Sequence, residues 1–215
     1  MEITWYGHSC FRLTERNFVT VVTDPFDSKS VGYDPLKLKA EIVTISHDAP
    51  GHNNSDAIKG TTHVLTGSGE FEIGGVFITA VQMEGAVKKS KDKVRNTVYV
   101  FDYDGITVAH LGDLQQIPTQ SEVELLGTVN VALIPVGGGN SLNAAKAAEV
   151  ISMLEPNIVV PMHYATPDSK IKLDEINKFL KEMGLGKQDA QPSLKVTRTS
   201  LPSETHVVVL QYQKG

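Results

Sequence analysis

Three apolar segments of the chain each end on a side chain that can bind a metal ion. They are Ile45-Ser46-His47, Leu111-Gly112-Asp113 and Val160-Pro161-Met162-His163. Functional side chains collect at the ends of strands, because the sheet fixes their positions and the loops leave them open to solvent. Imidazole and carboxylate groups together are ligands that zinc or iron takes. Any one of these residues, taken singly, is more often a partly buried side chain satisfied by a backbone group.

The remaining sequence alternates between short strands and a few helices. β-Branched and aromatic runs predict strands over 3–6, 11–14, 18–23, 42–46, 76–81, 97–101, 106–109, 131–136, 158–160, 194–197 and 206–211. Apolar residues at helical spacing predict a helix over about 141–154, capped by Asn140 or Ser141, and a second helix over about 171–183. The Asp104-Gly105 pair predicts a tight hairpin. This order of elements indicates a layered α/β architecture.

Composition narrows the class of protein. A length of 215 residues favours one domain, 1–215, and a net charge of -5 argues against a general nucleic-acid binder. The single cysteine, Cys10, excludes an intramolecular disulfide and fits a reducing compartment. The sequence has no signal-peptide pattern and no apolar run near the ~20 residues of a membrane span. We expect a cytoplasmic protein with a small-molecule ligand and no nucleic-acid or membrane partner. The sequence leaves open whether the chain forms a homo-oligomer.

The segment His47-Asp48-Ala49-Pro50-Gly51-His52 resembles the His-x-His-x-Asp-His signature of the metallo-β-lactamase superfamily, with two of its four signature positions changed. Further segments are similar, in the same order, to the branch that includes the ascorbate-6-phosphate lactonase-like proteins: 5–11, 23–25, 67–72, 110–114, 134–139 and 161–164. The resemblance implies an αββα four-layer sandwich, in which two sheets pack face to face between helices. It also implies a metal site at one edge of that sandwich.

Typical members of the family bind two metal ions through five histidines and two aspartates. The resemblance carries four of these seven positions over to this chain. His47 and His52 match the first and last histidines of the motif, Asp113 matches the bridging aspartate, and His163 matches the C-terminal histidine. These four residues are the predicted metal ligands.

Three of the family's ligand positions are changed. Ala49 stands in place of the second motif histidine, Gly51 in place of the motif aspartate, and Gly85 near the place of the middle histidine. None of these side chains has a donor atom. The two-metal site is therefore expected to be degraded, since one of the two ions would lose two of its four ligands.

The other ion would keep His52, Asp113 and His163, and His47 lies within the same motif. Three protein ligands plus water is the usual composition of a catalytic zinc site. We therefore expect at most one divalent ion, which would be zinc, manganese or iron, and leave open that none is bound.

The changed motif also bears on function. In family members the aspartate absent at Gly51 helps to hold the attacking water. We expect a protein that does not hydrolyse substrates in the family's manner; the alternative is a single-metal hydrolase of a small ester, lactone or phosphorylated metabolite. Asp48 is expected to point away from the site, and Glu84 is a candidate substitute for the missing carboxylate. No catalytic residue is assigned.

Other candidates have weaker signals. His8 follows the first strand and can lie near the site, but a structural role is favoured. Three further histidines lie within or beside predicted strands and are interpreted as structural or exposed: His63, His110 and His206. The basic run 88–95 is typical of a solvated loop, and its functional alternative is a cover for an anionic substrate. The glycines at 137–139 fit either a sharp turn beneath the site or a phosphate contact at a helix start.

Overall fold

The structure is a computed structural model that describes residues 1–84 and 95–214. The position expected for the family's middle histidine, Gly85, lies outside the described residues. So does most of the basic run, 88–94, and the hypothesis that this run covers an anionic substrate stays a prediction.

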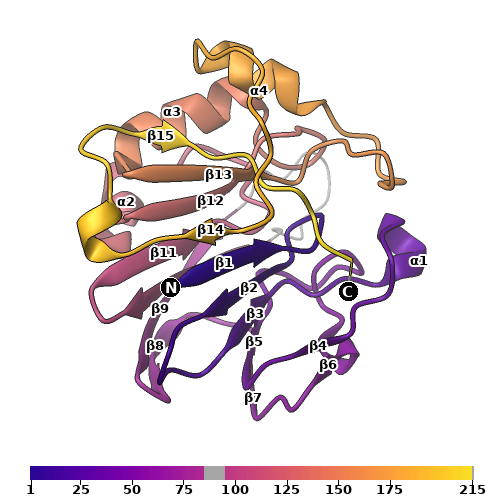
Figure 1. Ribbon diagram of the computed structural model, residues 1–215, viewed down its shortest axis with the longest axis vertical. Coiled ribbons are helices and arrows are strands. Elements are labelled where there is room, and N and C mark those ends of the chain that lie inside the picture. Colours follow the sequence, from indigo (N-terminus) through magenta and orange to yellow (C-terminus); the bar gives the residue numbers. More distant parts are fainter. Residues whose placement is uncertain (85–94, 215) are drawn as a thin grey trace.

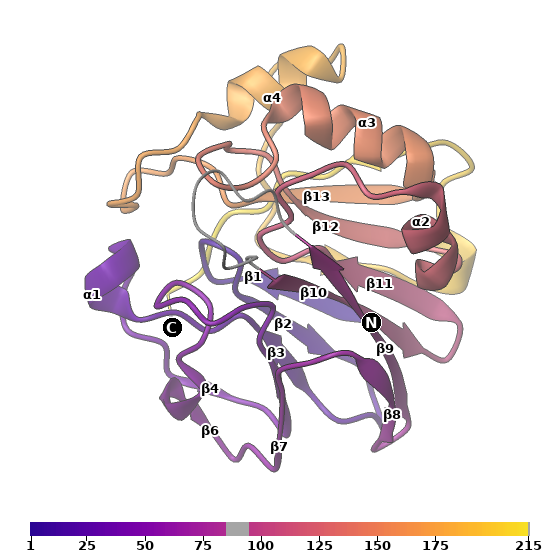
Figure 2. The ribbon, with the colours of Figure 1, turned by 180° about the vertical axis from the view of Figure 1, so that it is seen from behind.

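Two large sheets face each other across the main hydrophobic core (Figures 1 and 2). The first has the order β14-β1-β2-β3-β5-β7, and its strands are, in that order, Leu194–Lys195, Glu2–Trp5, Phe11–Thr14, Val21–Thr23, Ile42–Thr44 and His63–Leu65. The second has the order β15-β13-β12-β11-β10-β9-β8, with strands His206–Val207, Ile158–Met162, Val131–Pro135, Ile106–His110, Arg95–Tyr103, Val76–Glu84 and Gly69–Ile73.

Two outer layers complete the fold. The helices α2 (Gln120–Leu126), α3 (Ala144–Leu154) and α4 (Ile176–Glu182) lie on the outer side of the second sheet (Figure 2). A smaller cluster of buried residues covers the outer face of the first sheet, and it includes α1 (Ser28–Val31) and the strand pair β4 (Leu38–Lys39) and β6 (Ile58–Lys59). The predicted α/β fold class, two sheets between flanking layers, is confirmed.

The burial pattern explains why these segments form strands. In β2 the buried side chains of Phe11 and Leu13 alternate with two half-buried polar ones, as expected for a strand with one face on the core. The parallel strands β12 and β13 are buried at every position, because the second sheet has the first sheet on one face and helices on the other. Asp104 and Gly105 both have positive φ, as the predicted tight hairpin requires.

The helices begin later than the sequence indicated. Asn143, rather than Asn140 or Ser141, caps α3 by accepting a hydrogen bond from the Lys146 amide. Residues 138–142 instead form a tight turn closed by hydrogen bonds from Gly138 to Leu142 and from Ser141 to Gly138. α4 begins at Ile176 rather than 171, because the preceding residues run alongside the second sheet, where the Asp174 amide donates to the Gly137 carbonyl.

The loops that follow several strands gather at one end of the molecule. The loop after β1, the helix α1 and the segment after β13 lie at the same end in both views (Figures 1 and 2). Within residues 1–84 and 95–214, no helix is long and apolar enough to cross a membrane.

Candidate metal centre

Five side chains form a closed ring at this end of the sheets. They come from the loops after β1, β5, β11 and β13, and in order around the ring they are His8, His52, His47, Asp113 and His163. The ring centroids lie 4.8 Å apart for His8 and His52, 4.2 Å for His52 and His47, and 4.2 Å for His163 and His8. Asp113 completes the ring, with carboxylate oxygens 3.8 Å from Nε2 of His47 and 3.6 Å from Nε2 of His163.

The structure thus brings together all four residues predicted as ligands. The donor atoms of His47, His52 and Asp113 lie within 4.8 Å of one another. The distances from Asp113 to His47 and His163 are too long for hydrogen bonds. They match two ligands of a shared ion, because two atoms that each lie ~2 Å from one ion are at most ~4 Å apart.

Asp24 positions two of these histidines. It is fully buried in the loop after β3 and accepts three hydrogen bonds, two from Ser46 (2.7 Å from the amide, 2.6 Å from Oγ) and one from Nδ1 of His52 at 2.8 Å. Because the Ser46 hydroxyl donates its proton to Asp24, it can only accept from Nδ1 of His47, 3.1 Å away. Both histidines therefore carry the proton on Nδ1 and leave Nε2 with a free lone pair.

Ser141 fixes His163 in the same way. Its hydroxyl donates to the carbonyl of Gly138 at 2.9 Å, so it accepts from Nδ1 of His163 at 3.2 Å. Nε2 of His163 therefore has its lone pair free, on the side of the ring that faces Asp113. Metal-binding histidines in proteins are held in this manner, with the second nitrogen bonded to a fixed partner.

Asp113 is positioned through its backbone rather than its carboxylate. Asn96 accepts from the Asp113 amide at 2.8 Å and donates to the Leu111 carbonyl at 2.9 Å, which fixes the turn after β11. Within the described part of the chain, Oδ1 of Asp113 is buried and has no hydrogen-bond partner. A buried carboxylate oxygen without a donor is costly, and a bound cation would remove that cost. The donor set therefore fits a divalent metal ion.

Burial favours the neutral form of His8, His47 and His163. It lowers the pKa of His163 to about 4, although the Asp113 carboxylate opposes this shift. Burial, followed by the neighbouring histidines, lowers the pKa of His8 well below its usual range, and the same causes lower the pKa of His47. Neutral imidazole is the form that binds metal ions.

Asp24 is ionised although it is completely buried. Burial raises its pKa, but the nearby His110 and His52 and the hydrogen bonds it accepts outweigh this effect and lower the pKa to about 2. The carboxylate therefore stays charged and holds His52 in one orientation.

Three residues around the ring have strained backbones. Asp24, His8 and His163 have φ of 39°, 50° and 53°, in the left-handed region that residues other than glycine rarely adopt. The His163 amide donates to the His8 carbonyl at 3.1 Å, which ties two of these residues together. Such strain is concentrated at functional sites, where the surrounding structure compensates its cost.

The remaining candidates lie outside the ring. His63 and His206 are exposed, and His110 is buried with Nε2 2.8 Å from the Ser9 carbonyl, as a structural histidine should be. Asp48 is exposed and accepts from Asn53, so it points away from the site as expected.

The residue that the sequence analysis undervalued is His8. The sequence favours a structural role for it over a place near the site, and the structure places it in the ring. Its position just past the end of β1 is the same signal that identified the other histidines, and this signal could have found it.

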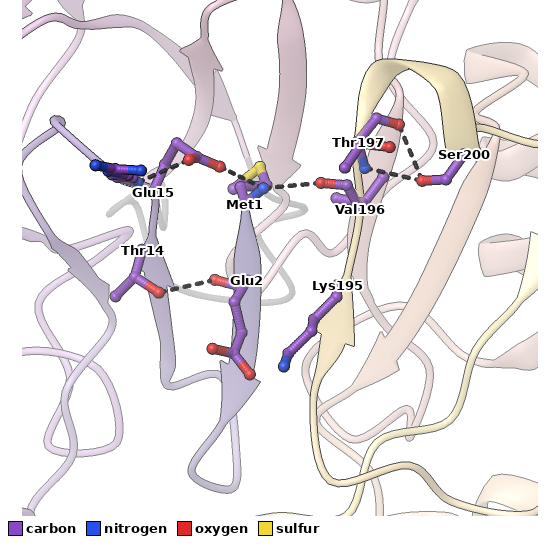
Figure 3. A pocket seen from close by; sticks show the side chains of 9 residues that line it. Met1, Glu2, Thr14, Glu15, Lys195, Val196, Thr197 and Ser200 are labelled. Carbon is purple, nitrogen blue, oxygen red and sulfur yellow. Dashed lines mark hydrogen bonds and ion pairs between the residues drawn. The ribbon is translucent and has the colours of Figure 1, made fainter.

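A cavity of about 310 Å³ opens onto the ring. Besides the five donors, its lining includes Ala49, Gly51, Asn140, Lys172 and Leu173. A larger hollow of about 680 Å³ lies between the N-terminus and β14 (Figure 3). Its lining includes no histidine, and several of its polar groups pair with one another: Met1 with Glu15 and Val196, Glu2 with Thr14, and Thr197 with Ser200. The ring is therefore the better candidate site.

Comparisons with known proteins agree with this geometry. Residues 2–163 match the family model of the β-lactamase superfamily domain. The chain is 34% identical to a candidate Zn-dependent hydrolase of the metallo-β-lactamase superfamily from Thermotoga maritima, with a TM-score of 0.78 over 97% of both chains. It is also 26% identical to a UPF0173 metal-dependent hydrolase from Thermococcus onnurineus over 77% of this chain and 85% of that one.

A UPF0173 metal-dependent hydrolase from Methanocaldococcus jannaschii is likewise 26% identical, over 85% of this chain and 94% of the relative. Three observations lead to the same assignment. They are the two facing sheets, the position of the ring at one end of the sandwich, and the extent of the family match. The chain belongs to the metallo-β-lactamase superfamily.

Proposed function

We propose that this protein is a mononuclear metal-dependent hydrolase that does not use the two-metal mechanism of its superfamily. The observation that carries the proposal is the proton arrangement around the ring. Nδ1 of His47, His52 and His163 is in each case the hydrogen-bond donor, so three Nε2 lone pairs are available near the unpartnered Asp113 oxygen. A structural cluster of histidines would have no reason to orient all three in this way.

The ion would be held by His52, Asp113 and His163, with His47 as a further ligand. When bound, a divalent ion polarises an ester or phosphoryl oxygen and lowers the pKa of water toward ~7. The residues of the chain do the rest: Asp24 and Ser46 keep two imidazoles oriented, and the buried ring excludes bulk water from one side of the substrate.

The degraded ligand set is the second part of the proposal. Ala49 and Gly51 line the cavity at the motif positions where family members have a histidine and an aspartate, and neither has a donor atom. A second ion would keep too few ligands. Membership of the ascorbate-6-phosphate lactonase-like branch rests on the sequence motifs and is part of this proposal.

The cavity supports a small substrate. Its volume of about 310 Å³ is at the lower end of small-molecule sites. Lys172 is exposed at its rim, beside the apolar Leu173, and provides a positive charge for an anionic group. A small ester, lactone or phosphorylated metabolite has these properties.

A non-catalytic binding protein is the second candidate. One observation favours it: the position of the motif aspartate is Gly51, so no carboxylate at that point can orient an attacking water. Such a protein would retain the ion and the cavity but release no product.

Metal analysis separates these possibilities. Protein purified without chelator is assayed for bound metals by mass spectrometry, and then for hydrolysis of generic esters, lactones and phosphoesters. We expect one ion per chain and slow hydrolysis that is lost in Asp113→Asn. Two ions per chain would contradict the mononuclear site, and no ion would overturn the proposal. One ion with no activity above that of Asp113→Asn would favour the binding protein.

A further inference from the structure

His8 has the contacts of a metal ligand rather than of a core residue. Only 2% of its surface is exposed, and its ring lies against those of His52 and His163. The donor atoms of His8, His52 and His163 lie within 4.8 Å of one another. They form a second group of possible metal ligands, next to the group of His47, His52 and Asp113. The backbone of His8 is fixed on both sides, because its carbonyl accepts from the Trp5 indole at 3.0 Å and from the His163 amide at 3.1 Å.

The imidazole of His8 lacks a hydrogen-bond partner. Its Nδ1 is buried and bonds to no other group in residues 1–84 and 95–214. Buried polar atoms in native structures nearly always have a partner, so an orphaned one needs an explanation. The other three histidines of the ring each bond to a serine or an aspartate, and His8 is the exception.

His8 also occupies the space next to Gly51. A Cβ built on Gly51 would lie 2.8 Å from Nε2 of His8, closer than real Cβ atoms come, and at a tight 3.2 Å from its Cδ2. The φ of Gly51 is not in the left-handed region, so its backbone would accept other residues. A side chain at position 51, where the family's aspartate would reach the metal, therefore requires the His8 imidazole to move from its place in the ring.

We propose that His8 is a metal ligand that has replaced the aspartate missing at position 51, so that one ion is held by His8, His52, His163 and Asp113. This inference rests on the proposed mononuclear site and gives the place of its fourth protein ligand to His8 instead of His47. In this chain the ligand would be a nitrogen from the loop after β1, where family members have a carboxylate oxygen from the loop after β5. A site with three nitrogen donors and one carboxylate favours zinc over magnesium or calcium.

A swap of the two residues tests the proposal. Zn²⁺ binding is measured by calorimetry, and the visible spectrum of bound Co²⁺ reports the number and type of its ligands. The variants are His8→Gly, Gly51→Asp and the double variant His8→Gly/Gly51→Asp. Glycine is chosen because it tolerates the φ of 50° at this position. His8→Asn is a second variant that keeps the left-handed backbone, which Asn also tolerates.

We expect both His8→Gly and His8→Asn to weaken Zn²⁺ binding. Loss of a residue that only supports a ligand lowers metal affinity ~10–100-fold, and loss of the ligand itself should lower it at least as much. Gly51→Asp alone should also weaken it, because the new side chain collides with His8. The double variant should bind more tightly than either single variant and show an altered Co²⁺ spectrum, with oxygen in place of nitrogen. Thermal unfolding of the metal-free variants checks that each one folds.

Two results would overturn the proposal, and they are distinguishable. If the natural chain binds one ion and folded His8→Asn binds it with equal affinity and an unchanged Co²⁺ spectrum, His8 is not a ligand and the mononuclear site stands without it. If the natural chain binds no Zn²⁺ or Co²⁺, the mononuclear site itself is wrong, and the inference fails with it.

Discussion

At the scale of single residues, Asp24 has the largest influence on the site although it does not face the cavity. It is buried and charged, and it fixes both His52 and, through Ser46, His47. An aspartate in this position converts two flexible imidazoles into oriented ligands, since it determines which nitrogen carries the proton. Its φ of 39° shows that the chain accepts local strain to place it there.

Asp24→Asn should therefore weaken metal binding without removing any ligand. An amide oxygen in the place of Oδ2 can still accept from Ser46 Oγ and from Nδ1 of His52, but the amide NH₂ group then faces the Ser46 backbone N–H, which is also a donor, so the loop that holds both histidines has to shift. We expect a ~10–100-fold lower Zn²⁺ affinity in calorimetric titrations, the usual cost of losing such a partner. Asp48→Asn is the matched control: Asp48 is exposed, and its replacement should leave the affinity unchanged. Equal affinities for the two variants would contradict the role given to Asp24.

At the scale of elements, the turn after β12 supports the loop that carries His163. The amide of Gly137 donates to the His163 carbonyl at 3.1 Å, and a Cβ on Gly137 would lie 2.2 Å from that carbonyl oxygen. The sequence allows two interpretations of glycines 137–139, a sharp turn beneath the site and a phosphate contact. The contact of Gly137 with His163 agrees with the sharp turn. Glycine is needed at position 137 because two backbone segments come too close for any side chain.

Gly137→Ala should accordingly affect both stability and metal binding. The methyl group has to push the His163 backbone away, and we expect a loss of about 2–3 kcal/mol in the free energy of unfolding. Zn²⁺ affinity should fall with it, because His163 moves. Gly186→Ala is the control, since a Cβ there meets no atom within 4 Å. Urea unfolding of both variants provides the measurement, and identical curves would show that the loop adapts freely.

Patterns along the chain predicted the central strands well and the helix starts poorly. Strand periodicity reflects burial, which the sequence carries directly, so β2 is predicted at its exact bounds. The start of α3 depends on a cap, and three neighbouring polar residues compete for that role; Asn143 prevails because the turn at 138–142 uses the residues before it. The helix α2 was missed although Thr119 and Glu122 form a capping box that marks its start.

The site was predictable as far as its residues follow strand ends. His47, Asp113 and His163 lie together because the sheets bring those ends together, and His52 belongs to the same loop as His47. The orientation of the imidazoles was not predictable, because it depends on contacts between distant parts of the chain. The Ser46 hydroxyl donates to Asp24 and the Ser141 hydroxyl to the Gly138 carbonyl, and this leaves each serine as an acceptor for a histidine. The sequence offered a place near the site as one of two interpretations of His8, but the closeness of His8 to Gly51 was not predictable, because it exists only in three dimensions.

At the scale of the whole molecule, the buried histidines link folding to pH. The folded pKa of His163 is about 4, against 6.5 for an exposed imidazole, and burial lowers the pKa of His110 as well. Between pH ~4 and pH ~6.5 the unfolded chain therefore binds protons that the folded chain does not. The stability contributed by these neutral histidines is therefore complete above pH ~6.5 and is lost as the pH falls toward ~4. Asp24, with its pKa lowered to about 2 from 3.8, adds a further loss at still lower pH.

The metal-free protein should therefore unfold more easily in mild acid. We expect its free energy of unfolding, measured with urea in the presence of chelator, to fall by about 2–3 kcal/mol between pH 7.5 and 4.5. His163→Asn should flatten this dependence, because Asn tolerates the left-handed backbone at this position and does not titrate. His206→Asn is the matched control: His206 is exposed, so its surroundings hardly change on unfolding, and the dependence should be retained. A natural chain whose stability is constant over this range would show that His163 takes up a proton as readily in the folded state as in the unfolded chain, so that burial does not hold it neutral. In that case Nε2 of His163 would carry a proton in the acidic part of this range, and an ion would have to displace that proton in order to bind there.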